Sequence, residues 1–329
     1  YHMEMDRALF RCRRILDTVQ PLVCAVVERN DCSGSVCRRL QDRGAIVTGG
    51  GIGIGRAICL RLAAEGAQVC VVDYNEKLGQ ETARQIVAAG GRGFFAFADV
   101  TNEDSVSAAF EEAAKRFGRI DILVNNAVAF VFGHLMGKGH GSNTGTDREI
   151  TDADWMKVLK TNVMGYAKCI KLAMPYMLKN DVSNHNFNND QGQGVTRIAA
   201  GSRGAIVNVG SVSSFIAQPE FVPYNCSKGA VSQLTKCAAM DAAPHKEPKI
   251  QQVRINGVFP GTIETPGAYA HMKLTGVSIE EGKKIFGDSC LMKRQAAPEE
   301  IAAGVAFLAS DDSSFMTGEN IVMDGGGTI

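Results

Sequence analysis

Short apolar segments alternate with longer amphipathic segments along most of this chain. Short hydrophobic runs are typical of buried strands, and apolar positions that recur every three to four residues are typical of helices. From Gly44 onward this pattern predicts strands at 45–47, 69–72, 93–97, 122–124, 205–209, 254–259 and 321–323. It predicts helices at 57–65, 76–89, 105–117, 155–178, 224–242 and 299–309.

Strands that alternate with helices in this way form a parallel sheet with helices on both faces. The predicted fold class is therefore α/β, a doubly wound, Rossmann-like parallel sheet of about seven strands in a single domain. The alternation begins after residue 40, which separates an N-terminal extension (1–40) from the folded domain (41–329). Two polar stretches, 133–151 and 180–203, interrupt the alternation and are expected to be surface loops.

Composition narrows the range of partners. Because 35 basic residues balance 35 acidic ones, neither nucleic acid nor an anionic membrane is expected as a partner. No hydrophobic run approaches the roughly 18 residues of a membrane span. The ten cysteines show no zinc-ligand spacing, so no metal site is expected. Free thiols indicate a reducing compartment and therefore the cytoplasm, and four of them lie in apolar segments and are expected in the core: Cys59, Cys70, Cys169 and Cys237.

The extension carries an arginine-rich amphipathic pattern, which leaves a mitochondrial presequence as the alternative location signal. Presequences are poor in acidic residues and rich in serine. Here the only serines are Ser33 and Ser35, and acidic residues interrupt the pattern at Glu4, Asp6, Asp17, Glu28 and Asp31. The cytoplasm is therefore favoured.

A glycine-rich turn follows the first predicted strand and opens the first helix. Its sequence is Thr48-Gly49-Gly50-Gly51-Ile52-Gly53-Ile54-Gly55. Glycines allow a sharp turn and the close approach of a pyrophosphate, and a helix N-terminus offers N–H groups and a positive dipole. The spacing is T-G-x-x-x-G-x-G rather than G-x-G-x-x-G. An ordinary glycine turn is the alternative, but the place between strand and helix favours nucleotide binding.

An acidic residue, Asp73, ends the second predicted strand, twenty residues after Gly53. A carboxylate there can accept hydrogen bonds from an adenosine ribose and repel a 2′-phosphate. Neither Tyr74 nor Asn75 is basic, and the glycine loop contains no Arg or Lys. These features predict NAD rather than NADP, with a surface aspartate in a turn as the alternative.

Tyr224 and Lys228 lie four residues apart in a predicted helix and therefore share one face. An ammonium beside a phenol favours the phenolate, so the tyrosine pKa, ordinarily about 10, would move toward neutral pH. Such a tyrosine can exchange a proton with an alcohol oxygen. Taken alone the pair is weak evidence, because most pairs of this kind are solvated helix faces.

Read with these motifs, residues 44–327 resemble the classical short-chain dehydrogenases/reductases. Ser211 lies thirteen residues before Tyr224, as in that family, and Asn162 stands where the family has a helix asparagine. The other matching motifs, in the family's order, are Asp99-Val100, Asn125-Asn126-Ala127, Pro260-Gly261 with Thr262 and Thr265, Thr317-Gly318 and Asp324-Gly325-Gly326.

The resemblance implies a role for each matching position. Tyr224 would be the catalytic acid/base, and Ser211 would hydrogen-bond the substrate oxygen. Lys228 would hold the nicotinamide ribose and lower the Tyr224 pKa, and Asn162 would position a water that links Lys228 to solvent. The implied cofactor-binding residues are Gly49, Gly53, Ile54, Gly55, Asp73, Asp99, Val100, Asn126, Ala127, Tyr224, Lys228, Pro260, Gly261, Thr262 and Thr265.

The resemblance also implies a homotetramer, built on the helices that contain Trp155 and Tyr224. One departure is Val128, which follows Ala127 where the family has glycine and would narrow the site beside the nicotinamide. A substrate lid is expected at 262–295, with Phe286 and Cys290 among its apolar residues, and residues 129–132 are expected to add a second apolar wall.

The predicted function is the interconversion of a secondary alcohol and a ketone with NAD. One alternative is an NADPH-dependent 3-ketoacyl-thioester reductase, which Asp73 opposes. An alternative of another class is a catalytically silent nucleotide-binding scaffold. It predicts a degraded set of catalytic residues, whereas all four positions are filled here. The sequence leaves the substrate and the direction of reaction open.

Overall fold

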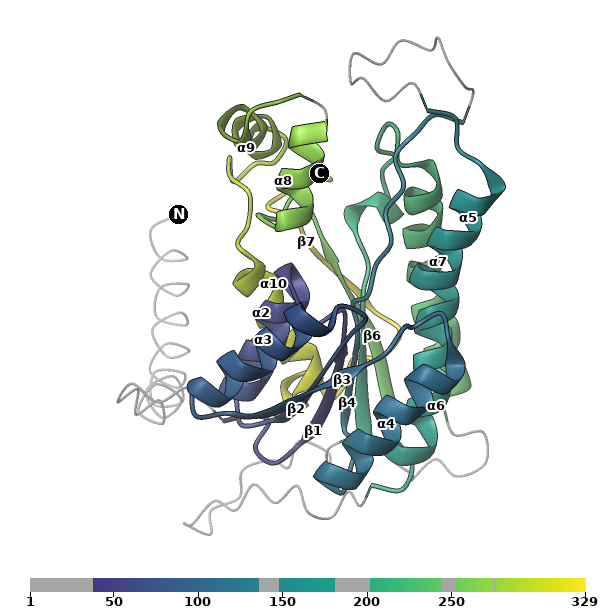
Figure 1. Ribbon diagram of the computed structural model, residues 1–329, viewed down its shortest axis with the longest axis vertical. Coiled ribbons are helices and arrows are strands. Elements are labelled where there is room, and N and C mark those ends of the chain that lie inside the picture. The colour runs from purple at the N-terminus through teal and green to yellow at the C-terminus, as the bar shows by residue number, and fades with distance from the viewer. Residues whose placement is uncertain (1–37, 136–147, 181–201, 244–252, 275) are drawn as a thin grey trace, which may run out of the picture. The chain divides into compact units, whose positions relative to one another are not determined.

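Seven parallel strands form one sheet at the centre of the folded region (Figure 1). The computed structural model describes residues 38–135, 148–180, 202–243, 253–274 and 276–329. The strands lie in the order β3-β2-β1-β4-β5-β6-β7, so the predicted doubly wound α/β sheet is confirmed. Their bounds are β1 Gly44–Thr48, β2 Gln68–Asp73, β3 Arg92–Phe97, β4 Ile122–Asn125, β5 Gly204–Val209, β6 Val253–Pro260 and β7 Asn320–Met323.

The strand order reverses between β1 and β4, which pair directly although two strands separate them in the sequence. In open parallel sheets, ligands bind beyond the carboxyl ends of the strands at such a reversal. The glycine turn leaves β1 here, and Asn126 follows β4 here. The topology therefore brings these two sequence motifs together.

Helices cover both faces of the sheet because successive strand side chains point to opposite sides. On β1, Ala45 and Val47 pack with α2 (Gly53–Ala64), α3 (Glu76–Ala88) and α10 (Pro298–Ala309). Ile46 points the other way. It packs with the cluster beneath α4 (Glu103–Phe117), α6 (Gly165–Met177) and α7 (Val222–Asp241). Both faces are thus dry, and this explains the nearly continuous apolar character of the central strands.

The long helix predicted at 155–178 is present but interrupted. It consists of α5 (Asp152–Leu159), a π-helical turn η1 (Lys160–Met164) and α6. A capping box between Thr151 and Asp154 starts α5. The π-helical turn contains Asn162, and π-turns of this kind are frequent at functional sites.

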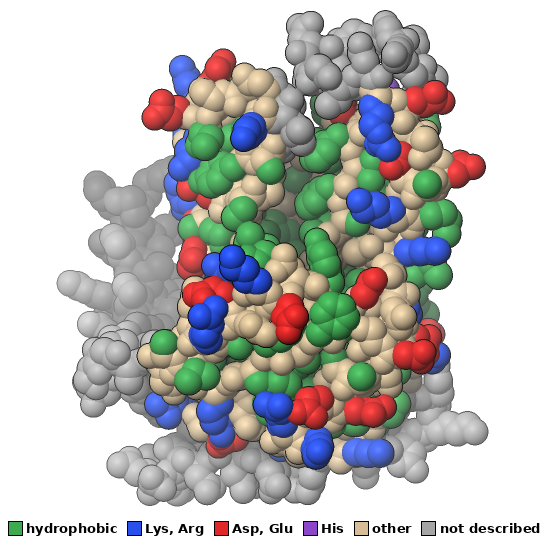
Figure 2. Space-filling model, viewed as in Figure 1, with side chains coloured by type: hydrophobic (Ala, Val, Ile, Leu, Met, Phe, Trp, Pro, Cys, Tyr) green, Lys and Arg blue, Asp and Glu red, His purple; other side chains and the backbone are tan. Residues whose placement is uncertain are grey.

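The lid region between β6 and α10 contains two helices that the sequence pattern did not reveal, α8 (Pro266–Leu274) and α9 (Ile279–Asp288). Figure 2 shows a hollow between this region and α7, with hydrophobic side chains along its walls. The hollow lies above the carboxyl ends of the strands, where the fold places a ligand.

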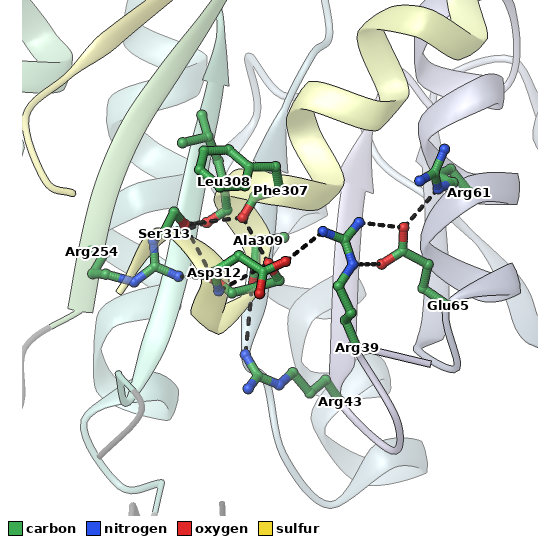
Figure 3. A network of polar contacts seen from close by, with 11 residues as sticks. Arg39, Arg43, Arg61, Glu65, Arg254, Phe307, Leu308, Ala309, Asp312 and Ser313 are labelled. Atoms are coloured by element: carbon green, nitrogen blue, oxygen red, sulfur yellow. Dashed lines mark hydrogen bonds and ion pairs between the residues drawn. The ribbon is translucent and has the colours of Figure 1, made fainter. Parts of the chain in front are cut away.

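At the amino ends of the strands, opposite the cavity, arginines connect several elements (Figure 3). Arg39 binds both oxygens of the buried Glu65 carboxylate, at 2.8 and 2.7 Å, and its third nitrogen binds Asp312 at 2.7 Å. Arg254 donates to the carbonyls of Leu308 and Ser310, at 3.0 and 2.9 Å. These contacts connect β6 and the segment before β1 with the end of α10 and the short 3-10 helix η3 (Asp311–Ser313).

The start of the compact unit and one cysteine differ from the predictions. Leu40 is fully buried, so the compact unit begins at Arg38 and includes residues that the sequence reading gave to the extension. Cys59, Cys70 and Cys169 are buried as predicted, but Cys237 is exposed, and its prediction as a core residue was wrong. It lies on the outer face of α7, whose buried face in this part of the helix consists of Thr235, Ala238 and Ala239.

Residues 1–37 lie outside the described residues, as do most of the two predicted surface loops. Within the described ranges, no helix has the length and apolar character needed to cross a membrane. The same ranges contain no group of three or more His, Cys, Asp or Glu side chains placed to hold a metal ion.

Candidate active site

One cavity of about 720 Å³ opens at the carboxyl edge of the sheet. Its walls are mostly apolar, and they come from the segment after β4, the start of α7, the segment after β6 and the lid helices. Nine of the predicted site residues line it: Ile54, Asn126, Ser211, Tyr224, Lys228, Pro260, Gly261, Thr262 and Thr265. These residues span more than 200 positions of sequence, and the fold brings them to one place.

Tyr224 and Ser211 meet in the wall of this cavity. Ser211 lies just beyond the C-terminal end of β5, after Gly210, and Tyr224 lies in the first turn of α7. Both residues line the cavity and each is only 8% exposed, and the Ser211 hydroxyl donates to the Ser213 hydroxyl at 3.1 Å. The phenol is therefore held beside a second hydroxyl, where both can contact one substrate oxygen.

Lys228 lies one turn further along α7 on the same buried face as Tyr224. Its ammonium nitrogen donates to the carbonyl of Val209 at 2.7 Å and lies 5.7 Å from the centre of the Tyr224 ring. The hydroxyl of Tyr166 donates to the same carbonyl at 3.2 Å. Val209 thus fixes the lysine head beside the tyrosine.

Burial sets the protonation of this pair. It raises the pKa of Tyr224 to about 12, although the hydrogen bond to Ser211 acts in the opposite direction. It lowers the pKa of Lys228 to about 7. The prediction that Lys228 draws the Tyr224 pKa toward neutrality is therefore wrong for the protein described here, since loss of hydration disfavours both charged forms.

Asn162 is fully buried behind the cavity and does not line it. Its side-chain oxygen accepts from the Ala129 N–H at 2.7 Å, and its amide nitrogen donates to the Ala129 carbonyl at 3.1 Å and to the Ser227 hydroxyl at 3.0 Å. Ser227 in turn donates to the Tyr224 carbonyl at 2.7 Å. Asn162 therefore ties the segment after β4 to the helix that carries Tyr224.

The glycine loop requires glycine at defined positions. Gly49 and Gly53 have φ angles of +64° and +57°, in the left-handed region that other residues avoid. A Cβ on Gly55 would lie 2.0 Å from the Gly49 carbonyl oxygen. The Asn126 amide donates to the carbonyls of Thr48 and Gly49, at 3.1 and 3.0 Å, and so fixes the loop to the end of β4. Ala127 lies beside it, with its N–H on the Thr48 hydroxyl at 3.2 Å.

The N-terminus of α2 suits an anion. Its N-cap residue, Ile52, makes no side-chain hydrogen bond to the first turn, and that turn contains no acidic side chain. The first backbone N–H groups of this 12-residue helix therefore have neither a capping oxygen nor a neighbouring carboxylate, unlike those of α3 and α4, which Asn75 and Asn102 cap. The loop fits the pyrophosphate of a dinucleotide.

Asp73 lies at the end of β2 beside this loop, outside the cavity. Its carboxylate accepts from the N–H of Gly51 at 2.9 Å and from the N–H of Asn75 at 2.8 Å. The nearest basic side chain of α2, Arg56, donates to the Gly51 carbonyl at 2.6 Å and to the Thr82 hydroxyl at 3.1 Å. The carboxylate and the loop are thus one hydrogen-bonded unit.

Asp99 and Val100 follow β3 and lie outside the cavity. Asp99 is exposed, and its carboxylate accepts from the Thr101 N–H at 2.8 Å. Val100 is buried against α6, where a Cβ on Gly165 would come within 3.1 Å of it. Together with Asp73 and the glycine loop they lie along the carboxyl edge, on the β3 side of the reversal point.

The predicted apolar walls are present. Phe130 stacks on the Tyr224 ring with 4.7 Å between the ring centres, and Phe132 contacts Phe221 edge-on at 4.8 Å. From the lid, Phe286 and Cys290 line the cavity. The wall thus presses an aromatic ring against the tyrosine.

One polar residue of the cavity wall was missed by the sequence analysis. Glu220 lies four residues before Tyr224, is 7% exposed and lines the cavity. The signal was present in the sequence, since Glu220 is a charged residue in the otherwise apolar or neutral run from Ile216 to Tyr224. The motifs of the resembled family do not include the segment that contains Glu220, so they gave this residue no role.

Comparisons with known proteins agree with this geometry. A family model described as enoyl-(acyl carrier protein) reductase matches residues 50–328. The short-chain dehydrogenase anuF of Penicillium roqueforti is 38% identical over 290 residues, which cover 87% of this chain and 95% of that protein. The cyclopentanol dehydrogenase of Comamonas sp. is 30% identical over 290 residues, 88% of this chain and 98% of that protein.

A solved structure, that of gox2181, superposes with a TM-score of 0.70 at 29% identity. The match covers 88% of this chain and 98% of that one. Sequence, family model and fold agree over the same span, from the glycine loop to the C-terminal glycines. The chain belongs to the short-chain dehydrogenase/reductase family, whose dehydrogenases use nicotinamide cofactors.

Proposed function

We propose that this protein interconverts a secondary alcohol and a ketone, with NAD as the cofactor. The observation that carries the proposal is the place of Tyr224 and Ser211 in the wall of one apolar cavity, which also reaches the glycine loop at Ile54. A bound nicotinamide would accept or give the hydride. The chain itself would position the substrate and move the proton.

The two hydroxyl groups have different tasks. Ser211 would donate a hydrogen bond to the substrate oxygen and orient it, while Tyr224 would take the hydroxyl proton in oxidation and return it in reduction. Phe130, stacked on the Tyr224 ring, holds the phenol in place and keeps water from its face. An apolar environment of this kind strengthens each of these hydrogen bonds.

Lys228 would hold the nicotinamide ribose beside Tyr224 and serve as the next proton donor and acceptor of the site. Because burial lowers the pKa of Lys228 to about 7, this group can both gain and lose a proton near neutral pH. Asn162 would hold the segment after β4 and the helix of Tyr224 at the separation that lets a water connect Lys228 with solvent. Its contacts to Ala129 and Ser227 support the holding role.

The dinucleotide would be held along the carboxyl edge. The glycine loop and the uncapped N-terminus of α2 suit the pyrophosphate, and the segment from Pro260 to Thr265 would cover the nicotinamide. The Asp73 carboxylate, at the end of β2 beside the glycine loop, would accept hydrogen bonds from an adenosine ribose and would repel a 2′-phosphate. These features support NAD.

Replacing Tyr224 by Phe tests the chemistry. The variant should bind the cofactor like the wild type, because the ring and its stacking on Phe130 are kept, but should lose at least about 100-fold in kcat, because proton transfer is lost. Screening secondary alcohols with NAD gives the measurement. Unchanged turnover in the variant would contradict the role of Tyr224, and no turnover of any alcohol by the wild type would favour a catalytically silent binding protein.

Titration with NADH and NADPH, followed by nicotinamide fluorescence, tests the cofactor. We expect NADH to bind at least about 10-fold more tightly, and Asp73→Ser to reduce that preference. Tighter binding of NADPH would overturn the role of Asp73 and would favour the NADPH-dependent 3-ketoacyl-thioester reductase instead.

We also propose a homotetramer formed through the helices that carry Trp155 and Tyr224. Exposed methionines on these helices, Met156 (46% exposed) and Met240 (72% exposed), support burial of this surface between subunits. Light scattering on purified protein would show four chains per particle, whereas a monomer would contradict the proposal.

A further inference from the structure

A buried carboxylate stands in the apolar wall of the active-site cavity. The Glu220 side chain is only 5% exposed, and it lines the cavity together with Ile216, Pro219 and Phe221. Burying a carboxylate among apolar groups costs free energy unless polar partners compensate. His134 is one such partner, and Glu220 also lines the cavity that a ligand would enter.

The backbone holds Glu220 in an unusual conformation. Its φ angle is +66°, in the left-handed region that residues with a Cβ seldom adopt. The Glu220 carbonyl accepts from the Gly133 N–H at 3.1 Å, and Gly133 pairs with Phe221 in an isolated bridge. Strain of this kind persists where the surrounding structure enforces it, and it concentrates at ligand sites.

The side chain is oriented by a histidine. His134 Nε2 lies 3.5 Å from Glu220 Oε1, and His134 belongs to the same segment that supplies Phe130 and Phe132 to the cavity. A carboxylate offers about four lone-pair positions, so it can hold His134 and still accept a hydrogen bond from a ligand. The segment after β4 and the start of α7 thus present the carboxylate together.

Two readings of Glu220 are open. In the first, it serves only to fasten residues 133 and 134 to the start of α7, and the substrate is indifferent to it. In the second, it contacts the substrate directly. The second is supported by the place of Glu220 in the lining of the cavity.

We propose that Glu220 determines substrate specificity by accepting a hydrogen bond from a second hydroxyl group of the alcohol. The preferred substrates are then apolar-bodied diols, in which one hydroxyl meets Tyr224 and Ser211 and another meets Glu220. This inference rests on the proposed alcohol–ketone chemistry and names the substrate class of that same site. A substrate without the second donor leaves the buried carboxylate without that bond, and such sites discriminate strongly against analogues that lack it.

The test compares alcohols that differ by one hydroxyl group. Cyclohexanol is assayed beside cyclohexane-1,2-, 1,3- and 1,4-diol, and decahydronaphthalen-2-ol beside decahydronaphthalene-2,6-diol. Within each carbon skeleton the apolar contacts are nearly constant, so the ratio of kcat/KM values isolates the second hydroxyl. We expect at least one diol to exceed its mono-alcohol by 10-fold or more, as for a hydrogen bond to a charged group.

Two variants assign that preference to Glu220. Glu220→Leu keeps the Cβ and the backbone strain but removes the acceptor, so kcat/KM for the favoured diol should fall about 10- to 100-fold. The mono-alcohol should stay within about threefold. Glu220→Gln keeps an acceptor oxygen without the charge and should give an intermediate loss. Glu149→Gln is the matched control, because Glu149 lies beside His134 in an isolated bridge but is exposed and does not line the cavity.

Equal kcat/KM values within each skeleton would overturn the inference, as would an equal loss for diols and mono-alcohols in Glu220→Leu. Turnover of none of these alcohols by a protein that binds NADH would also overturn it, since diols are the predicted substrates. Failure to bind either NADH or NADPH would instead remove the proposed function on which the inference rests. The cofactor titration therefore separates the two failures.

Discussion

At the scale of single residues, Tyr224 and Lys228 show how burial controls chemistry. The same loss of water favours the neutral form of both, so the tyrosine holds its proton more tightly and the lysine more weakly. The lysine is left with a pKa of about 7, which a solvated helix face would not give. The i, i+4 spacing predicted the pair, but depth of burial decides its charge.

This burial predicts a pH dependence of stability. Below pH 7, Lys228 is charged in both the folded and the unfolded chain, and the full cost of burying the charge opposes folding. Between pH 7 and about 10.5 the Lys228 side chain binds more protons in the unfolded chain than in the folded one. The contribution of Lys228 to the unfolding free energy therefore rises with pH in this range. From pH 6 to pH 9 the gain is about 2–3 kcal/mol.

Lys228→Met removes this titration. Urea unfolding of wild type and variant at pH 6 and pH 9 measures the difference, and comparing the two proteins cancels the contribution of other groups. The variant should be relatively more stable at pH 6 than at pH 9. A stability difference independent of pH would mean that Lys228 titrates alike in both states.

The sequence predicted which residues meet in the cavity far better than it predicted their electrostatics. Tyr224, Lys228 and Ser211 could be named because their spacing is local or matches a known family. Glu220 could not, since its importance depends on a neighbour, Gly133, more than 80 residues away and on a left-handed backbone. Cys237 was misplaced because an apolar helical pattern does not show which of its positions face outward.

At the scale of elements, the π-helical turn at Lys160–Met164 changes the register between α5 and α6 and contains the fully buried Asn162. Its amide satisfies both the N–H and the carbonyl of Ala129. An alanine there leaves two half-buried backbone groups and the Ser227 hydroxyl without this partner. The turn is thus a joint between the sheet and the catalytic helix.

Asn162→Ala should therefore destabilise the protein by about 2–4 kcal/mol and reduce kcat by at least about 10-fold. Ser227→Ala is the matched control, because it removes one contact of Asn162 and leaves the two to Ala129. It should cost about 1 kcal/mol and little activity. Thermal melts and steady-state kinetics give both readouts, and equal effects of the two variants would contradict the role given to the turn.

The glycine loop makes a second prediction at this scale. In Gly55→Ala the added Cβ would lie 2.0 Å from the Gly49 carbonyl, so the loop must move and nucleotide binding should weaken at least about 10-fold. Gly229→Ala, in α7, meets nothing within 4 Å and should stabilise the helix by about 0.5–1 kcal/mol. Nucleotide fluorescence and thermal melts distinguish the two, and unimpaired binding by Gly55→Ala would argue against the loop as the pyrophosphate site.

Periodicity predicted nearly every strand and helix, because the buried faces of β1 and of α4 repeat with regular spacing. It did not reveal α8 and α9, which are only 9 and 10 residues long. Nor did it reveal the π-helical turn, since the turn spans only five residues and shifts the apolar pattern by a single position. These are the elements that shape the site rather than the core.

At the scale of the whole molecule, the carboxyl and amino ends of the strands have different functions. The carboxyl edge bears the cavity, and the amino edge is fastened by charged groups (Figure 3). Glu65 is 1% exposed and pairs with both Arg39 and Arg61, while Asp312, the other partner of Arg39, has a 52% exposed side chain. The sequence did not predict this network, because Arg39 and Asp312 lie near opposite ends of the folded region in the sequence.

Glu65→Ala should destabilise the protein by about 1–3 kcal/mol, because Arg39 and Arg61, whose side chains are 23% and 39% exposed, lose a charged hydrogen-bond partner. Asp312→Ala removes an exposed partner of the same Arg39 and should cost at most about 1 kcal/mol. Urea unfolding measures both, and cofactor affinity should be the same in the two variants, since neither side chain approaches the cavity. Similar losses from the two substitutions would show that burial does not govern this network.

The amino edge has a consequence for engineering. Asn180 donates to the carbonyls of Ile120 and Arg203, both at 2.8 Å, so the two ends of the polar segment 181–202 are clasped together at the edge opposite Tyr224. When the two ends of a segment are already joined, lengthening the chain between them costs little closure entropy. A fluorescent reporter or a second enzyme could be grafted there without disturbing catalysis, which makes this position a handle for building the protein into larger assemblies.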